Sequence, residues 1–209
     1  KFSDNHRIDC ITREIGREIE ESTQPNGGAF QALDIGCGDM TLTDSLQLAF
    51  PMGKFTCVDI HACPKDLKER DPRWNRYIQY DGMNLPFKNR EFDIGFFSDV
   101  LHHIPDESIV DVLKEASRVC QTVIIKDHFE RGFFSRHALR AMDFLGNYGY
   151  GIKIPKRYLR EDQLKSICDS SNLEIKKVRT GIRLYDHLPV IRSLLSSNWQ
   201  MIAVCESRR

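Results

Sequence analysis

The stretch Ala32-Leu33-Asp34-Ile35-Gly36-Cys37-Gly38-Asp39-Met40-Thr41 decides the fold of this chain. It begins as an apolar strand, reaches an acidic residue near the strand end, turns through two glycines and leads into a helical pattern. A strand, a glycine turn and a helix in this order are typical of an α/β domain with a ligand at the turn. Two glycines one residue apart let the backbone approach that ligand closely.

The acidic residue Asp34 indicates which ligand the turn accepts. A pyrophosphate is held by bare backbone N–H groups at a helix N-terminus, with no carboxylate beside it. A ligand with a cationic ammonium group is favoured by that carboxylate. The dinucleotide pattern also needs a third glycine, where this chain has Thr41. The residues therefore favour S-adenosylmethionine, with a nicotinamide-dependent oxidoreductase as the weaker alternative.

The composition is ordinary for a globular protein. The chain has 209 residues, of which 41% are hydrophobic and 29% charged, and this favours a single domain. A formal net charge of +0 argues against nucleic acid as a partner. No apolar run approaches the roughly 20 residues that cross a bilayer, so we expect no transmembrane segment.

The cysteines point to a reducing compartment. There are 7, and none forms a C-x-x-C pair, so we expect no metal site and a cytoplasmic location. The chain begins with Lys1 rather than Met, and we therefore expect it to be a fragment. Nothing in the sequence indicates its oligomeric state.

Strand and helix patterns alternate along most of the chain, which predicts an α/β fold with a mainly parallel sheet. We expect one domain, with an N-terminal helix and loop at 1–28, a substrate lid at 129–158 and an insertion at 181–197 between the last two strands. Strands are predicted at 30–35, 54–60, 77–80, 92–98, 121–126, 173–180 and 199–206, and helices at 4–21, 41–50, 64–70, 106–119, 135–145, 161–170 and 189–195.

Acidic residues follow five successive predicted strands. They are Asp34, Asp59, Asp81, Asp99 and Asp127. In an open parallel sheet, ligands bind beyond the carboxyl ends of the strands. Asp59 lies about 20 residues past the glycine turn, and an acid at that spacing accepts the hydroxyls of a ribose. Nicotinamide enzymes and methyltransferases both use such an acid, so Asp59 alone does not separate them.

Four motifs together resemble the class I S-adenosylmethionine-dependent methyltransferases, in the small-molecule group that includes the ubiquinone and menaquinone C-methyltransferases. They are 33–38 (LDIGCG), 58–59 (VD), 81–87 (DGMNLPF) and 92–104 (FDIGFFSDVLHHI). The resemblance implies a Rossmann-like, doubly wound sheet of seven strands, with helices on both faces and an antiparallel last strand. It also implies S-adenosyl-L-methionine as the cofactor and a small-molecule acceptor, methylated on oxygen or carbon.

The resemblance implies a role for each residue of the first motif. Gly36, Cys37 and Gly38 would pass under the methionine part of the cofactor. Asp34 would act on its amino group, directly or through water, and Asp59 would hold the ribose. A role for Asp34 as a turn or helix-capping residue is the alternative.

The later motifs are assigned in the same way. Ile60 would pack on the adenine, Asp81 would accept from its amino group, and Gly82 and Met83 would lie beside the ring. Ser98 would line the pocket near the sulfonium. Asp81 as the former of an Asx turn, and Ser98 as a packing residue, are the alternatives.

Methyl transfer needs a general base only where the nucleophile must lose a proton. His128 and His103 are the predicted catalytic candidates, because each follows a strand on the ligand side; His102 and Asp127 share that position. A purely structural role is the alternative for all four. A cofactor-binding module without catalysis is the second hypothesis for the whole chain.

The segment after residue 128 would contact the acceptor. Tyr148 and Tyr150, flanked by glycines, are predicted to belong to a mobile lid. The basic residues Lys153, Lys156, Arg157 and Arg160 are interpreted as a solvated face, with binding of a phosphate or carboxylate of the substrate as the alternative.

Overall fold

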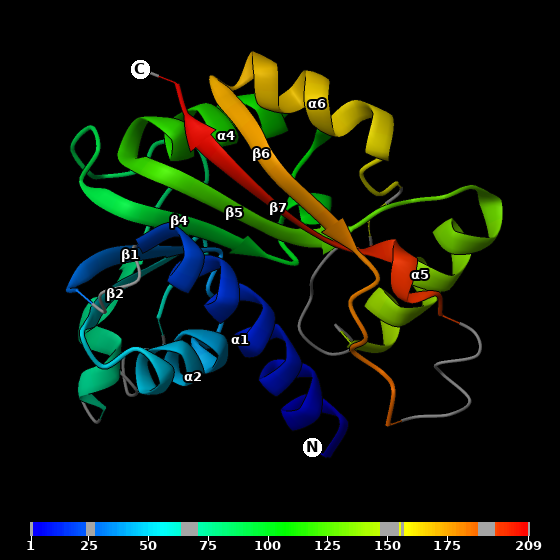
Figure 1. Cartoon of the computed structure of the whole chain (residues 1–209), viewed down its shortest axis with the longest axis horizontal. Helices are drawn as coiled ribbons and strands as arrows, with labels where there is room; N and C mark the ends of the chain where they lie inside the picture. The colour runs from blue at the N-terminus through cyan, green and yellow to red at the C-terminus, as the bar shows by residue number, and fades with distance from the viewer. Residues whose placement is uncertain are drawn as a thin grey trace.

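Seven strands form one sheet in the computed structural model of the chain, in the order β3-β2-β1-β4-β5-β7-β6 (Figure 1). Neighbouring strands from β3 to β5 are parallel, and β7 runs antiparallel to both β5 and β6. The predicted Rossmann-like architecture is therefore confirmed. The strands are β1 (Phe30–Ile35), β2 (Gly53–Asp59), β3 (Tyr77–Gln79), β4 (Phe92–Ser98), β5 (Cys120–His128), β6 (Leu173–Thr180) and β7 (Gln200–Ser207).

The structure describes residues 2–23, 28–63, 71–146, 155, 157–187 and 195–208. Its helices lie on both faces of the sheet, with α4 and α6 over one face and α1 and α2 over the other (Figure 1). They are α1 (Phe2–Thr23), α2 (Thr41–Ala49), α4 (Asp106–Val119), α5 (Phe133–Gly146) and α6 (Glu161–Ser170), with short 3-10 turns η1 (Pro72–Arg76), η2 (Leu101–His103) and η3 (Ser197–Trp199).

The alternating pattern of the strands separates two cores. In β1, Ala32 packs into the core under α1 and α2, whereas Leu33 packs into the core under α4 and α6. Successive strand residues point to opposite faces, so a strand covered on both sides is apolar at nearly every position. β4 shows this most clearly, because Phe96 and Phe97 are both fully buried on opposite faces.

The N-terminal helix is an integral part of the domain. Ile11, Ile15 and Ile19 of α1 are buried, as the helical spacing of its isoleucines predicts. On the same helix Glu18 is 1% exposed and accepts hydrogen bonds from Lys177 and Arg179 of β6. These contacts fix the second half of α1 against β6, and Arg7 near the start of the helix pairs with Asp99, which follows β4.

Strand β5 is longer than predicted. It continues to His128, because Asp127 and His128 pair with Met201 and Gln200 of β7. These two residues are therefore strand residues, and both are buried. The predicted helices at 64–70 and 189–195 fall wholly or largely outside the described residues. None of the described helices is long and apolar enough to cross a membrane.

Candidate active site

The glycine turn after β1 is held over the end of β2. The N–H groups of Gly36 and Cys37 both donate to the carbonyl oxygen of Val58, at 2.8 and 3.2 Å. Gly36 (φ 82°), Gly38 (φ 55°) and Met40 (φ 63°) all have left-handed backbone conformations. Glycine adopts this conformation without strain, which explains two of the three positions.

The two glycines of the turn have different surroundings. A Cβ atom on Gly36 would lie 2.7 Å from Cγ2 of Val100, so the close approach at this position is to the protein's own side chain. A Cβ atom on Gly38 would meet nothing within 4 Å. Gly38 is therefore the position of the turn that faces open space.

Alanine substitutions at the two glycines should destabilise the protein to different extents. Gly36→Ala combines a left-handed φ with overlap on Val100, and we expect a loss of about 2–4 kcal/mol in the free energy of unfolding. Gly38→Ala keeps only the backbone strain, at about 1 kcal/mol. Urea denaturation of both variants checks this order, and equal losses would contradict it.

The carboxylate of Asp59 connects the end of β2 to the glycine turn. Its Oδ2 accepts the N–H of Gly38 at 2.9 Å, and its Oδ1 accepts the N–H of His61 at 3.0 Å. Asp59 is 7% exposed. Each carboxylate oxygen can accept a second hydrogen bond, so the group keeps acceptor capacity toward a ligand.

Two exposed apolar side chains lie at the ends of neighbouring strands. Ile60 follows β2 and is 54% exposed, and Met83 follows β3 and is 38% exposed. Gly82, which directly precedes Met83, lies against Ile60, since a Cβ atom there would be 3.1 Å from Cγ2 of Ile60. Asp81 accepts the N–H groups of Met83 and Asn84 at 2.7 and 2.6 Å, so its Asx-turn geometry is present. This turn fixes the backbone beside Ile60.

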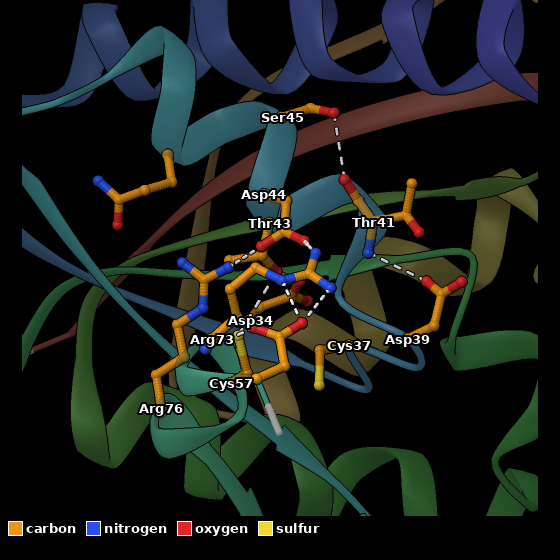
Figure 2. Close-up of polar contacts among 12 residues, drawn as sticks. Asp34, Cys37, Asp39, Thr41, Thr43, Asp44, Ser45, Cys57, Arg73 and Arg76 are labelled. Carbon is orange, nitrogen blue, oxygen red and sulfur yellow. Dashed lines mark hydrogen bonds and ion pairs between the residues drawn. The ribbon is translucent and has the colours of Figure 1, made fainter. Parts of the chain in front are cut away.

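Asp34 lies beneath the turn and does not face solvent. It is 2% exposed and accepts a hydrogen bond from the Thr43 hydroxyl of α2, as Figure 2 shows. Burial, with a smaller contribution from the charge of Asp59, raises the pKa of Asp34 to about 7. Arg73 and Arg76 of η1 both pair with Asp44 of α2 and close this side of the site (Figure 2).

The raised pKa of Asp34 predicts a specific pH dependence of stability. The folded pKa of about 7 lies above the ordinary aspartate pKa of 3.8, so the folded state holds the proton more tightly between these two values. The free energy of unfolding should fall as the pH rises through this window and then level off, because the unfolded state ionises first. Asp34→Asn should remove this slope, measured as the difference between variant and wild type in urea titrations from pH 4 to 8. Parallel profiles would contradict it.

A charged cluster lies where β4 and β5 end. Lys126 of β5 is fully buried, and its Nζ lies 2.5 Å from Oδ1 of Asp99 and 2.8 Å from Oε1 of Gln200. Asp99 also pairs with Arg7 of α1. Ser98, just before Asp99, is partly buried at the same edge. The cluster therefore joins α1, β4, β5 and β7 at the ligand side of the sheet.

Near this edge, His102 lies closer to a carboxylate than His128 does. Its Nδ1 lies 2.6 Å from Oδ1 of Asp127, and its Nε2 lies 3.7 Å from Asp143. Burial disfavours the charged ring, but Asp127 outweighs burial and raises the pKa of His102.

The two predicted bases lie close to this pair. Burial and the charge of Lys126 lower the pKa of His128, which is 5% exposed, so its ring is neutral at pH 7. The ring of His103 lies 4.1 Å from that of His102.

The structure brings most of the predicted site together at one edge of the sheet. Gly36, Cys37, Gly38, Asp59 and His61 surround the turn, and the group around Gly82 adjoins it through Ile60. The lid candidates Tyr148 and Tyr150 lie outside the described residues, as do Lys153 and Lys156. Sequence reasoning missed Arg7 and Lys126, because a lone cation in a helix or a strand gives no signal of the contact it makes. It also missed Val100, whose contact with Gly36 joins two separate motifs.

Comparison with known proteins agrees with this geometry. Residues 33–122 match a family described as a methyltransferase domain, and the match begins at the glycine turn and ends in β5. This match supports the predicted resemblance to the class I S-adenosylmethionine-dependent methyltransferases.

Individual relatives are distant from this chain. Malonyl-[acyl-carrier protein] O-methyltransferase of Legionella pneumophila is 27% identical over 120 residues, which are 56% of this chain and 42% of the relative. The chain thus spans less than half the length of that protein.

Solved structures show the same methyltransferase fold. A SAM-dependent methyltransferase of Methanosarcina mazei has a TM-score of 0.65 and 19% identity, covering 91% of this chain and 97% of that one. A methyltransferase in complex with the Haloferax volcanii activator Trm112 also has a TM-score of 0.65, with 11% identity and coverage of 99% and 98%.

Proposed function

We propose that this chain binds S-adenosyl-L-methionine across the ends of β1, β2 and β3 and transfers its methyl group to a small-molecule acceptor. The observation that carries the proposal is the open space at Gly38, beside a carboxylate that is hydrogen-bonded to the same turn. A nucleoside with a charged amino-acid tail fits a glycine turn and an acid placed in this way.

Each described residue has a part in this binding. The second lone pairs of Asp59 accept the ribose hydroxyls, and Ile60 and Met83 hold the two faces of the adenine. Gly38 allows the methionine part to lie against the turn. Asp34, because it is buried and bonded to Thr43, acts on the amino group through the turn or a water molecule rather than by direct contact.

The sulfonium supplies an activated methyl group, so the protein mainly aligns the acceptor and excludes water. Where the acceptor must lose a proton, His128 is the better placed of the two predicted bases, because its ring is neutral and can accept one. Oxygen and carbon acceptors both fit this chemistry. Relatives of each kind share the fold, among them a mitomycin 7-O-methyltransferase and the CurJ carbon methyltransferase.

Turnover with a radiolabelled methyl donor tests the proposal. The chain is incubated with labelled S-adenosylmethionine and a panel of small hydroxyl, carboxyl and activated-carbon acceptors, and label is sought in the extracted product. Transfer to one acceptor class supports the proposal. Tight binding of the cofactor without transfer to any acceptor would instead favour a non-catalytic cofactor-binding module.

A further inference from the structure

A cavity of about 440 Å³ lies next to the proposed methyl-transfer site, on the α4 and α6 side of the sheet. The segment after β4 separates the two. Val100 packs on Gly36 of the turn, while the next residues, Leu101 and His102, line the cavity. A molecule in this cavity therefore contacts the residues that directly follow Val100, which itself packs against the glycine turn.

The inner wall of the cavity is apolar, and its rim is polar. Leu101, Ile109, Leu113 and Leu164 are buried, whereas Asp106, Asp162, Gln163 and Ser166 are exposed. Such walls favour an aliphatic or ring-shaped ligand, because removing apolar surface from water is favourable. The apolar lining includes Leu101, Ile104, Ile109, Leu113, Leu159 and Leu164.

One side of the cavity carries three arginines. Arg136 pairs with Glu130, yet its Nε is buried and has no hydrogen-bond partner among the described residues. Arg160 pairs with Asp162, and both are well exposed. Arg157 is exposed at the cavity, and its positive charge acts on the carboxylate of Glu130. Arg136 therefore keeps one buried donor without an acceptor among the described residues.

Backbone dipoles add to this positive side. Helices α4 and α6 both begin at the cavity. The N-cap of α4 is Pro105, which provides no side-chain cap, whereas a capping box between Arg160 and Gln163 closes the N-terminus of α6. A helix N-terminus attracts anions through its free N–H groups. Three carboxylates also lie in the lining: Glu130 pairs with Arg136, Asp162 pairs with Arg160, and Asp106 lies in the first turn of α4.

We infer that this cavity holds the acceptor by an apolar body and one anionic head group, a carboxylate or a phosphate, with Arg157 and Arg136 as the head-group ligands. Planar guanidinium forks bind both kinds of oxyanion. The inference rests on the proposed function for the identity of the ligand as acceptor. It also assigns Arg157 and Arg160, predicted as a solvated face, to a binding site.

Calorimetry with three eight-carbon probes tests the inference. Octanoate, octyl phosphate and octanol are titrated into the wild-type chain, with and without S-adenosylhomocysteine. We expect one or both anionic probes to bind roughly ten- to a hundredfold more tightly than octanol, as a charge-assisted hydrogen bond provides. The octanoate and octyl phosphate arms separate a carboxylate head from a phosphate head.

Variants then show which residue produces the preference for anionic over neutral probes. Arg157→Gln, at an exposed side chain that should not disturb folding, is expected to reduce the preference for the anion to less than threefold, or about 0.6 kcal/mol. Arg131→Gln is the matched control, because Arg131 pairs with Glu161 outside the cavity. Ile167→Trp, which fills the cavity, should weaken all three probes alike.

Failure of this inference can be told apart from failure of the proposed function. Equal affinity for anionic and neutral probes, or a preference that survives Arg157→Gln, overturns the inference whether or not the cofactor binds. Failure of S-adenosylhomocysteine to bind in its own titration overturns the proposed function, while the anion preference measured without it still reports on the cavity.

Discussion

Replacing Asp59 with alanine is expected to weaken the binding of S-adenosylhomocysteine by at least about a hundredfold. The substitution removes a carboxylate that can accept two ribose hydroxyls, and each such bond to a charged group contributes about 1.5–3 kcal/mol. It also releases the N–H of Gly38, which Asp59 holds at 2.9 Å. Isothermal titration calorimetry of the variant and the wild type measures the difference in the dissociation constant.

Asp93 provides a matched control for this experiment. It is also an aspartate at a strand end, but it lies where β4 begins, and it accepts the N–H of Gln31 at 2.8 Å. Asp93→Ala should leave the affinity for S-adenosylhomocysteine within about twofold of wild type, because ligands bind at the opposite edge of the sheet. Equal losses in Asp59→Ala and Asp93→Ala would mean that the effect is one of stability and not of ribose binding.

The second large effect is expected at Asp99. Asp99→Ala leaves the fully buried Lys126 without its carboxylate at 2.5 Å and also removes the partner of Arg7. Uncompensated buried charges of this kind cost about 3–5 kcal/mol, and we expect that loss in the free energy of unfolding. Guanidinium denaturation at pH 7 measures it.

Two comparisons separate the ion cluster from local strain. Asp99 has a left-handed backbone (φ 57°), which asparagine tolerates, so Asp99→Asn should lose less than Asp99→Ala. Asp111→Ala removes an exposed pair with Lys114 on α4 and should cost under about 1 kcal/mol. A loss at Asp99 no larger than that at Asp111 would show that the cluster does not hold α1 against the sheet.

Hydrophobic periodicity was sufficient to predict the sheet. Strand β4, predicted at 92–98, matches the structure at both ends, because its residues are buried on both faces. The α6 helix at 161–170 and strand β6 at 173–180 match equally well. The end of β5 was wrong by two residues, because pairing with the antiparallel β7 continues the ladder through Asp127 and His128.

The site was predictable where function imposes a local pattern and unpredictable where it depends on distant contacts. The glycine turn and Asp59 are separated by a spacing that the sequence displays. The contact of Val100 with Gly36 joins two separate motifs, and the pairing of Arg7 with Asp99 spans 92 residues. The preference of His102 over His103 for Asp127 likewise depends on how η2 turns after β4, which two adjacent histidines do not encode.

The structure of this chain with S-adenosylhomocysteine bound tests the central claim most directly. We predict that the ribose hydroxyls contact Asp59, the adenine lies between Ile60 and Met83, and the homocysteine part crosses Gly38. A nucleoside bound anywhere else on the chain, with the space at Gly38 left empty, would contradict the account.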